Sequence, residues 1–389
     1  MKKLKHIDVI TRYFYPVEGG IEDSIKNLYS RLLLKGWDVT IHTSKDSYEK
    51  KDILTDEDIV EGLNVKRYSF GKLGFFPRID WKNTNLICLH NFNLFPHFFI
   101  LFYSFLLKIS GRKKFNLVLT PHGGFTPNWQ SFPQLVALIK KTYHYTCGAF
   151  LLNSVVGKIR ALSEWEKLEI TKSHIYEKMI DVIPDGLEDE AFKDVDKLSR
   201  SGIKEKARGL GRYLIQIGKI YPLKNYETVI RSLVYIPKDV KYLIVGSVKD
   251  RTYFNKLNKL AKKLKLGKRV VFAGVVRGID KFYLLKNAKI MVHLSLYESY
   301  AKVVYEGISQ GLVCIVSENT GPSILIKENK AGFSIPAKDY EKLAEKINFF
   351  LSKENSEEIK QMKMSNKTLV SENSWDNVSK RVNHLYNEK

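Results

Sequence analysis

The chain has 389 residues, and its 64 Lys and Arg against 42 Asp and Glu give a formal net charge of +22. A hydrophobic fraction of 44% with ordinary Gly and Pro content excludes a disordered, collagen-like or coiled-coil chain, and the length predicts two domains. The basic balance predicts anionic partners, but no helix-turn-helix, zinc-finger or RNA-recognition signature occurs, so we expect no nucleic-acid binding.

Apolar strand patterns alternate with helix-period segments through the first half of the chain. Strands are predicted at 6–14, 37–44, 86–91, 116–122, 158–163 and 178–184. A helix follows the first strand and ends at Gly36, and a capping box at Ser163 opens another. Such alternation predicts a parallel sheet with helices on both faces.

The polar stretch 187–212 lacks a strand pattern and is predicted to be a linker. The alternation then restarts, with strands at 213–218, 241–246, 269–274, 289–295 and 313–317 and helices at 225–236, 252–266, 279–288, 300–310 and 340–351. The sequence therefore predicts an α/β fold of two doubly wound, Rossmann-like domains, 1–186 and 213–370, facing an inter-domain cleft. Ligands of such sheets bind at the carboxyl ends of the strands.

Two glycines and two lysines follow predicted strands. Gly19 and Gly20 open the first helix, where backbone amides can meet an anion, although a tight turn is the simpler alternative. Lys219 and Lys224 bracket the loop after the strand at 213–218. Two cations there can neutralise a diphosphate leaving group, unless both are ordinary surface lysines.

The segment ESYAKVVYE carries the sharpest signal of the sequence. Glu298 ends a predicted strand and Glu306 lies eight residues on, about 80° around a helix, so both carboxylates are expected on one side. Carboxylates accept hydrogen bonds from sugar hydroxyls, and the amides near Tyr300, Ala301 and Lys302 form a helix N-terminus suited to phosphate. This arrangement predicts a nucleotide-sugar site, with a chance pair of glutamates as the alternative.

His122, in the segment TPHGG, ends a predicted strand, and Gly123 and Gly124 permit close approach of a ligand. A histidine there can bind a sugar hydroxyl or act as acid or base, or it can be purely structural. No metal-ligand spacing and no Asp-x-Asp motif occurs, so we expect no metal and no cofactor.

These segments together resemble glycosyltransferase family 4, retaining enzymes of the GT-B fold within the group 1 glycosyltransferases. The GG loop, SEWEK, VIPDGL, IGKIYPLKN, LIVG, FAGVV and ESYAKVVYEGISQG follow that family's order over nearly the whole chain. The resemblance implies that Glu298 binds the donor sugar and Glu306 the ribose. It also implies that Lys219 and Lys224 bind the diphosphate and that His122 lies near the reacting sugar.

The resemblance further implies a metal-independent, retaining hexosyl- or related glycosyltransferase with a UDP- or GDP-linked donor, and a final helix, 371–389, that crosses back to the first domain. Three positions depart from the family pattern. The family often has Arg where this chain has Lys219, usually has Gly where it has Ala301, and commonly has Asn where it has Asp185.

The predicted function is transfer of a sugar from a nucleotide sugar to a glycan or lipid-linked acceptor, in synthesis of cell-surface polysaccharide such as lipopolysaccharide or capsule. One alternative is a GT-B-fold sugar-nucleotide epimerase. The other is a catalytically inactive, membrane-docked assembly subunit.

Residues 81–163 contain no acid, nine basic residues and fifteen aromatic residues. Their apolar run, 94–107, is too short to span a membrane and is predicted to be a helix. Lys108, Arg112, Lys113 and Lys114 close it and are the expected contacts with an anionic membrane surface, unless the run is simply core.

The three cysteines, Cys88, Cys147 and Cys314, are too few and too far apart for a disulfide framework, so we expect three reduced core thiols. Reduced thiols favour a cytoplasmic chain, here one peripheral on the inner face of the membrane.

Overall fold

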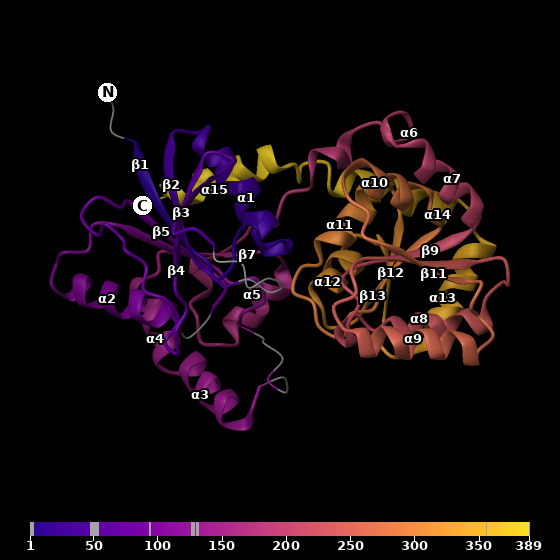
Figure 1. Cartoon of the computed structure of the whole chain (residues 1–389), viewed down its shortest axis with the longest axis horizontal. Helices are drawn as coiled ribbons and strands as arrows, with labels where there is room; N and C mark the ends of the chain where they lie inside the picture. The colour runs from indigo at the N-terminus through magenta and orange to yellow at the C-terminus, as the bar shows by residue number, and fades with distance from the viewer. Residues whose placement is uncertain are drawn as a thin grey trace. The chain divides into compact units, whose positions relative to one another are not determined.

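The computed structural model describes residues 4–46, 54–92, 95–125, 129, 132–354 and 356–388. Its contacts divide the chain into two compact units. Unit 1 comprises Met1–Gly186 and Trp375–Lys389, and unit 2 comprises Leu187–Ser374. Figure 1 shows that each unit is built around its own sheet with helices packed on it.

The sheet of unit 1 has eight strands in the order β3-β4-β2-β1-β5-β6-β7-β8, and all neighbours are parallel except β3 and β4. The strands are β1 (Lys5–Ile10), β2 (Trp37–Ser44), β3 (Glu57–Val60), β4 (Leu63–Tyr68), β5 (Leu86–His90), β6 (Asn116–Thr120), β7 (Lys158–Ala161) and β8 (Ile180–Val182). Buried aliphatic side chains fill most of the central strands, as expected for a sheet covered on both faces.

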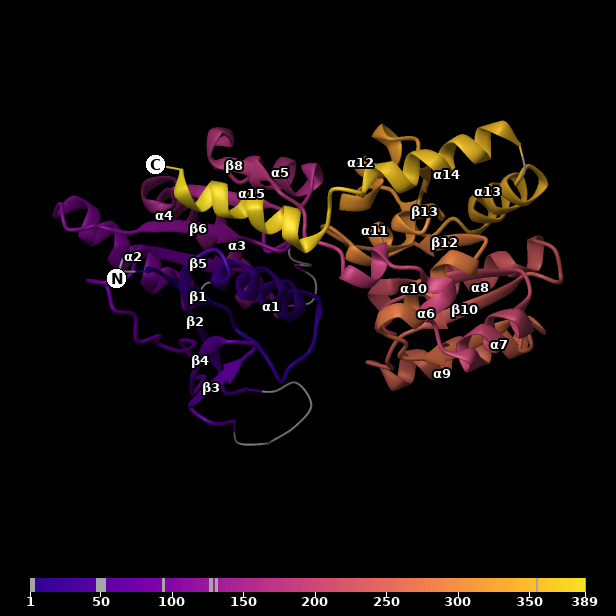
Figure 2. The ribbon, with the colours of Figure 1, turned by 90° about the horizontal axis from the view of Figure 1, so that it is seen from above.

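The helices of unit 1 are α1 (Gly20–Leu33), α2 (His97–Ile109), α3 (Gln134–Tyr145), α4 (Cys147–Val155), α5 (Glu164–Thr171), the short η2 (Glu177–Met179) and α15 (Trp375–Asn387). The last helix, α15, packs beside α1, as Figure 2 shows in yellow and indigo. Its first residue, Trp375, is fully buried against Gly186, where a β-carbon would lie 2.5 Å from the indole ring. Only glycine fits that position.

Unit 2 has a six-stranded sheet in the order β11-β10-β9-β12-β13-β14, parallel throughout. Its strands are β9 (Tyr213–Ile217), β10 (Lys241–Val245), β11 (Val270–Gly274), β12 (Ile290–His293), β13 (Val313–Ser317) and β14 (Gly332–Ile335). Its helices are η3 (Asp189–Phe192), α6 (Val195–Leu198), α7 (Ser201–Leu210), η4 (Pro222–Lys224), α8 (Tyr226–Ser232), η5 (Leu233–Tyr235), α9 (Arg251–Lys263), α10 (Gly278–Asn287), α11 (Lys302–Ser309), α12 (Gly321–Glu328), α13 (Tyr340–Ser352) and α14 (Glu357–Leu369).

The stretch 187–212 is not a linker as predicted, because it folds as η3, α6 and α7 within unit 2. Its spaced apolar residues Val195, Ile203 and Leu210 are buried, which gives these polar helices an inner face. The sequence also missed β3, β4 and β14. The first of these is too short and too exposed to carry a clear strand pattern.

Two further expectations change in the structure. Cys88 and Cys314 are buried, but Cys147 is exposed at the start of α4, so the prediction of three core thiols is wrong for that residue.

The predicted apolar run becomes α2, although its first residue, Leu94, lies outside the described residues. Among the described residues, no helix has the length and apolar content needed to cross a membrane.

Candidate active site

Lys224 and Glu298 form an ion pair at the carboxyl edge of the unit 2 sheet. Lys224 ends the short helix η4 that follows β9, and the side chain of Asn225 fixes this loop by donating to two backbone carbonyls. Lys224 Nζ lies 2.5 Å from Glu298 Oε2, and His293 Nε2 lies 3.3 Å from the same oxygen. Burial alone would raise the pKa of Glu298, but Lys224 and His293 outweigh burial and lower it to about 2. Glu298 is therefore an ionised hydrogen-bond acceptor at neutral pH.

Lys219, the other expected phosphate cation, is exposed, and its side chain makes no hydrogen bond or ion pair within the part of the chain that the structure describes. It lies two residues after the end of β9, at the same edge of the sheet as Lys224. His293, by contrast, was not expected from the sequence. A histidine inside the apolar strand KIMVHLS was the available signal.

Glu306 has different partners from Glu298. It is buried in α11, with Oε1 3.0 Å from Lys281 Nζ, and Lys281 also lies 3.1 Å from Glu188 Oε2. The prediction that both carboxylates lie on one side of a helix is wrong, because α11 begins at Lys302 and Glu298 lies in the loop before it. Lys281 and Glu188 were both missed, the latter because its segment was taken as a linker.

The N-terminus of α11 is preceded by a residue in the left-handed conformation. Ala301 has φ 55° and ψ 68°, a region that disfavours a β-carbon. Tyr300 packs its ring 4.4 Å from that of Tyr305, which holds the entry to the helix. Ala301 therefore occupies a conformation that glycine adopts more readily than alanine.

The carboxyl edge of the unit 1 sheet is held by a buried ion pair. Arg160 on β7 donates to Asp185 Oδ1 at 2.8 Å, and Ser24 on α1 donates to the other carboxylate oxygen. Ser24 Oγ also lies 2.8 Å from the carbonyl oxygen of Gly20. The start of α1, with Gly19 as its N-cap, is therefore tied to the segment after β8.

His122 follows β6 in a left-handed conformation, with φ 49°. Its Nε2 lies 2.9 Å from His90 Nδ1, and the two rings stack 5.2 Å apart. The next amide, of Gly123, donates to the carboxylate of Glu166, and a β-carbon on Gly124 would lie 2.6 Å from a backbone nitrogen. Burial lowers the pKa of His122 to about 4, so its ring is neutral at pH 7.

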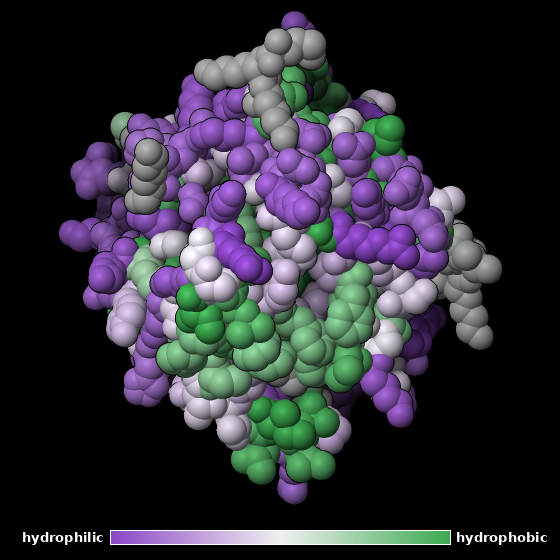
Figure 3. All heavy atoms as spheres, turned by 90° about the vertical axis from the view of Figure 1, so that its left-hand side faces the viewer, coloured by the Kyte–Doolittle hydropathy of each residue, from purple (hydrophilic) through white to green (hydrophobic). Residues whose placement is uncertain are grey.

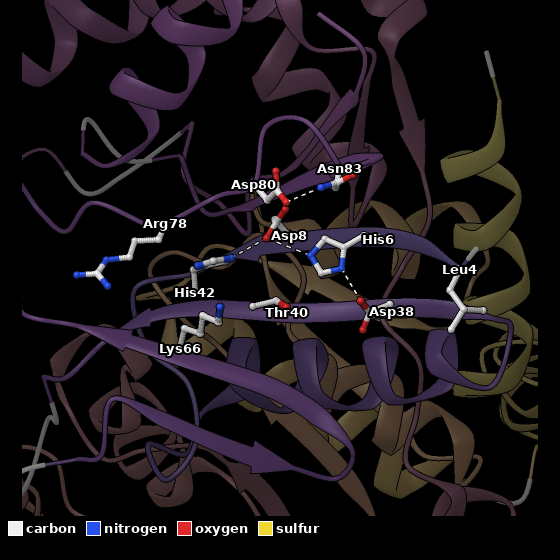
Figure 4. Close-up of a pocket in the computed structure, with 10 residues that line it drawn as sticks. All are labelled: Leu4, His6, Asp8, Asp38, Thr40, His42, Lys66, Arg78, Asp80 and Asn83. Atoms are coloured by element: carbon white, nitrogen blue, oxygen red, sulfur yellow. Dashed lines mark hydrogen bonds and ion pairs between the residues drawn. The ribbon is translucent and has the colours of Figure 1, made fainter. Parts of the chain in front are cut away.

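A pocket of about 740 Å³ lies over one face of the unit 1 sheet. It is lined by Leu4, His6, Asp8, Asp38, Thr40, His42, Lys66, Arg78, Asp80 and Asn83 (Figure 4). His42 Nε2 lies 2.7 Å from Asp8 Oδ1, and His6 Nδ1 lies 2.8 Å from Asp38 Oδ2. Several of its charged groups therefore pair with each other, and none of the expected site residues lines it. Polar residues alternating along β1 and β2 were its signal in the sequence.

The basic turn expected to meet a membrane is partly engaged within unit 1. Lys108 Nζ lies 2.5 Å from the carbonyl oxygen of Ser154, and Lys113 Nζ lies 2.9 Å from that of Phe115. Arg112 and Lys114 are exposed. Reversal of all four charges would therefore also disturb local packing.

The same part of unit 1 carries exposed apolar side chains, here called the α2–α4 apolar face. Its members are Phe102, Leu106, Ile109, Leu135, Val136, Leu138, Ile139 and Phe150. Figure 3 shows apolar side chains gathered on the side of unit 1 where α2, α3 and α4 lie, with α3 at the bottom of the view. The predicted run is thus only half core, since Ile100 and Leu101 are buried whereas Phe102 and Leu106 are exposed.

A family model described as "Glycosyl transferases group 1" matches residues 203–369, which lie within unit 2. This part of the chain is therefore similar to the group 1 glycosyltransferases. The matched region contains Lys219, Lys224, Glu298 and Glu306. The resemblance to group 1 glycosyltransferases noted from the sequence is therefore confirmed.

Among curated proteins, the chain is 29% identical over 186 residues to the Escherichia coli UDP-Gal:α-D-GlcNAc-diphosphoundecaprenol α-1,3-galactosyltransferase. This match covers 46% of each chain. A glycosyltransferase of Methanocaldococcus jannaschii is 28% identical over 177 residues, and the mannosylfructose-phosphate synthase of Agrobacterium fabrum is 26% identical over 152 residues. These two matches cover 44% and 34% of the relatives' own lengths.

Among solved structures, Anabaena HepE in complex with UDP and glucose has a TM-score of 0.72 at 18% identity, covering 98% of this chain and 99% of that one. WaaG, a glycosyltransferase involved in lipopolysaccharide biosynthesis, has a TM-score of 0.67 at 14% identity, covering 98% and 100%. At these identities the likeness shows the fold. The predicted GT-B fold class, with two Rossmann-like domains, is confirmed.

Proposed function

We propose that the protein is a retaining glycosyltransferase that moves a hexosyl or related sugar from a UDP- or GDP-linked donor to a glycan or lipid-linked acceptor in cell-surface polysaccharide synthesis. The observation that carries the proposal is the Lys224–Glu298 pair at the carboxyl edge of unit 2, inside the region that is similar to the group 1 glycosyltransferases. The names of the Escherichia coli relative and of HepE support a nucleotide-sugar donor, and the former also supports a lipid-linked acceptor.

In this proposal Lys224 exchanges its carboxylate partner for the donor diphosphate. A charged hydrogen bond there stabilises the negative charge that grows on the leaving group. Glu298, released from Lys224, accepts hydrogen bonds from hydroxyls of the donor sugar. Lys219, Glu306 and the amides from Tyr300 to Lys302 stay predicted donor contacts.

The bond that forms joins the acceptor oxygen to the anomeric carbon, on the face from which the diphosphate departs. The bond that breaks joins that carbon to the diphosphate oxygen, and a departing phosphate oxygen takes the acceptor's proton. The configuration at the anomeric carbon is therefore retained without a protein base. Lys219 and Lys224 supply the positive charge that this step requires, so we propose that it is independent of a metal ion.

Thermal unfolding of the full chain with a panel of UDP, GDP, ADP and their sugar conjugates tests the proposal, because a ligand that binds only the folded state raises the melting temperature. We expect one nucleotide sugar to raise the melting temperature, and Lys224→Ala to reduce this rise. Lys259→Ala, which removes an exposed lysine of α9, is the matched control.

Product analysis after incubation with the stabilising nucleotide sugar, together with the unfolding panel, separates the alternatives. Conversion of the stabilising nucleotide sugar to an isomer without acceptor would indicate an epimerase. Absence of binding to any nucleotide would indicate an assembly subunit. An equal rise for wild type and Lys224→Ala would contradict the proposed site.

We further propose that the α2–α4 apolar face lies on the anionic inner surface of the cytoplasmic membrane. Leu135, Leu138 and Ile139 of α3 are 50–68% exposed, and Lys140 and Lys141 follow them. Apolar side chains beside lysines, in a window without acids, match a surface of acyl chains beneath anionic headgroups. This placement brings unit 1 to a lipid-linked acceptor.

Cosedimentation with phosphatidylglycerol vesicles measures this contact. We expect wild type to bind these vesicles at low salt, to be released by salt and to ignore phosphatidylcholine vesicles. Leu138→Glu with Ile139→Glu should abolish binding, and Arg112→Glu with Lys114→Glu should weaken it. Val234→Glu, at an exposed apolar position of unit 2, is the control. Wild type that stays in the supernatant with anionic vesicles would contradict the membrane contact.

A further inference from the structure

A chain of hydrogen-bonded side chains inside unit 1 ends at His122. Tyr386 Oη lies 3.0 Å from Tyr29 Oη, Tyr29 Oη lies 2.9 Å from His90 Nε2, and His90 Nδ1 lies 2.9 Å from His122 Nε2. The four residues come from α15, α1, β5 and the loop after β6. Tyr29, His90 and Tyr386 are at most 3% exposed, so water does not compete for these hydrogen bonds.

The two histidines in this series of hydrogen bonds, His90 and His122, are neutral. Burial lowers the pKa of His90 well below its usual value and that of His122 to about 4. A neutral imidazole has one N–H and one lone pair, so each ring donates at one nitrogen and accepts at the other. The direction of the Tyr29–His90 hydrogen bond therefore fixes the direction of the His90–His122 hydrogen bond, and only two arrangements of these two contacts are possible.

The contact between Tyr29 and His90 decides between these arrangements. A phenol hydroxyl is a stronger donor than a neutral imidazole N–H, and the unprotonated imidazole nitrogen is a stronger acceptor than a phenol oxygen. Tyr29 therefore donates to His90 Nε2. His90 then carries its proton on Nδ1 and donates it to His122 Nε2. The proton of His122 is left on Nδ1, which has no hydrogen-bond partner within the described part of the chain.

We propose that Tyr29 and Tyr386, acting through His90, hold His122 in the Nδ1–H tautomer, so that His122 presents a hydrogen-bond donor to the substrate and does not act as a base. The tautomer stands on the geometry of unit 1 alone, and only the contact with substrate rests on the proposed function. Tyr29, His90 and Tyr386 are positioning residues. The final helix of the chain thereby sets the chemistry of a residue in the middle of unit 1.

The tautomer is measured by long-range ¹H–¹⁵N correlation in the full chain labelled with ¹⁵N-histidine, with His122→Asn identifying the signals of His122. We expect a pyrrole-type Nδ1 and a pyridine-type Nε2 at pH 7. Tyr29→Phe removes the hydroxyl that orients His90, and the ratio of the two His122 tautomers should fall about fivefold, the effect of one net hydrogen bond. Tyr386→Phe should act in the same direction and less strongly.

The control is Tyr143→Phe, which removes a buried hydroxyl of unit 1 that has no hydrogen-bond partner among the described residues. It should leave the His122 signals unchanged, which separates the orienting role from a general loss of packing. A wild-type His122 protonated at Nε2 would overturn the proposal. So would a tautomer ratio that neither Tyr29→Phe nor Tyr386→Phe alters in folded protein.

Transfer activity gives the second measurement. With the donor identified by thermal unfolding, Tyr29→Phe should lower kcat about two- to fivefold and leave the KM for the donor unchanged. The pH profile of the wild-type rate should show no titration of His122 between pH 5.5 and 8. If Tyr29→Phe changes the tautomer ratio of His122 but the wild-type protein has no transfer activity, the roles of Tyr29, His90 and Tyr386 as positioning residues are supported and the proposed function is contradicted.

Discussion

At the carboxyl edges of the two sheets, Glu298 of unit 2 and the histidines of unit 1 are held in different charge states. In unit 2, Lys224 and Glu298 are ionised partners, and the pKa of Glu298 falls to about 2. In unit 1, His90 and His122 are neutral, and burial raises the pKa of Glu166 to about 7. Burial favours the neutral form unless a counter-charge lies within contact distance. Unit 2 therefore offers charge for a charged ligand, and unit 1 offers neutral donors and acceptors suited to hydroxyl groups.

The largest effect is expected at the buried ion pair of this edge in unit 1, Arg160 with Asp185. Arg160→Met should lower the free energy of unfolding of unit 1 by about 3–5 kcal/mol, because Asp185 is left buried without its cation. All five tryptophans of the chain, at 37, 81, 129, 165 and 375, lie in unit 1, so tryptophan fluorescence in urea reports on that unit.

Lys158→Met is the control for this change. Lys158 is on the same strand as Arg160, but its partners Asp181 and Glu388 are more exposed, so its loss should cost less than about 1 kcal/mol. An equal decrease in the free energy of unfolding for Arg160→Met and Lys158→Met would show that the buried ion pair contributes no more than a surface ion pair.

The difference between the two edges also explains what the sequence could predict. Lys224 and Glu298 each follow a strand of a clear βα pattern, so their meeting at one edge of the sheet was predictable. The buried groups of unit 1 join residues far apart in the chain. Tyr29 and Tyr386 are separated by 357 positions, and no local pattern links them.

Glu166 shows how tertiary structure overrides a local motif. At the predicted capping box, Ser163 Oγ accepts a hydrogen bond from the Glu166 amide at 3.1 Å. The carboxylate of Glu166, however, accepts from the amides of Leu162 and Gly123. The sequence identified the helix start correctly and could not identify the contact with the His122 loop.

Glu166 supplies the second prediction, a pH dependence confined to unit 1. Its pKa is about 7 in the folded state against 4.5 when exposed, so the folded state holds one more proton between these values. The free energy of unfolding of unit 1 should therefore fall by about 3 kcal/mol as pH rises from about 4.5 to 7. Glu166→Gln should remove this slope.

Urea midpoints of wild type and Glu166→Gln at several pH values, followed by tryptophan fluorescence, measure the effect. The difference between the two proteins cancels the contributions of other titrating groups that both retain. A difference that is constant from pH 4.5 to 8 would mean that Glu166 titrates normally in unit 1.

The third prediction concerns the charged edge of unit 2. Lys224→Ala should weaken binding of the matching nucleoside diphosphate, UDP or GDP, about ten- to a hundredfold, since a charged hydrogen bond contributes about 1.5–3 kcal/mol. Lys219→Ala should weaken it less, because Lys219 is exposed and water screens its charge. Isothermal titration calorimetry measures both, and an unchanged affinity in the double variant would remove these lysines from the site.

The smallest effect is expected at Ala301, where the entry to α11 is strained. Replacing this left-handed alanine with glycine removes a steric cost of about 1–2 kcal/mol, offset by about 0.5–1 kcal/mol for the greater freedom of glycine in the unfolded chain. Ala301→Gly should therefore stabilise unit 2 by about 0–1.5 kcal/mol. Far-UV circular dichroism, compared with the tryptophan signal of unit 1, isolates the transition of unit 2.

Ala288→Gly provides the opposite sign within the same unit. Ala288 has φ −72°, which suits any residue, so glycine there should destabilise unit 2 by about 0.5–1 kcal/mol. Changes of the same sign at both positions would show that the left-handed conformation of Ala301 stores no strain. Opposite signs would show that the loop before α11 is held in a glycine-like conformation by its surroundings, with the amides that follow Glu298 already arranged before any ligand binds.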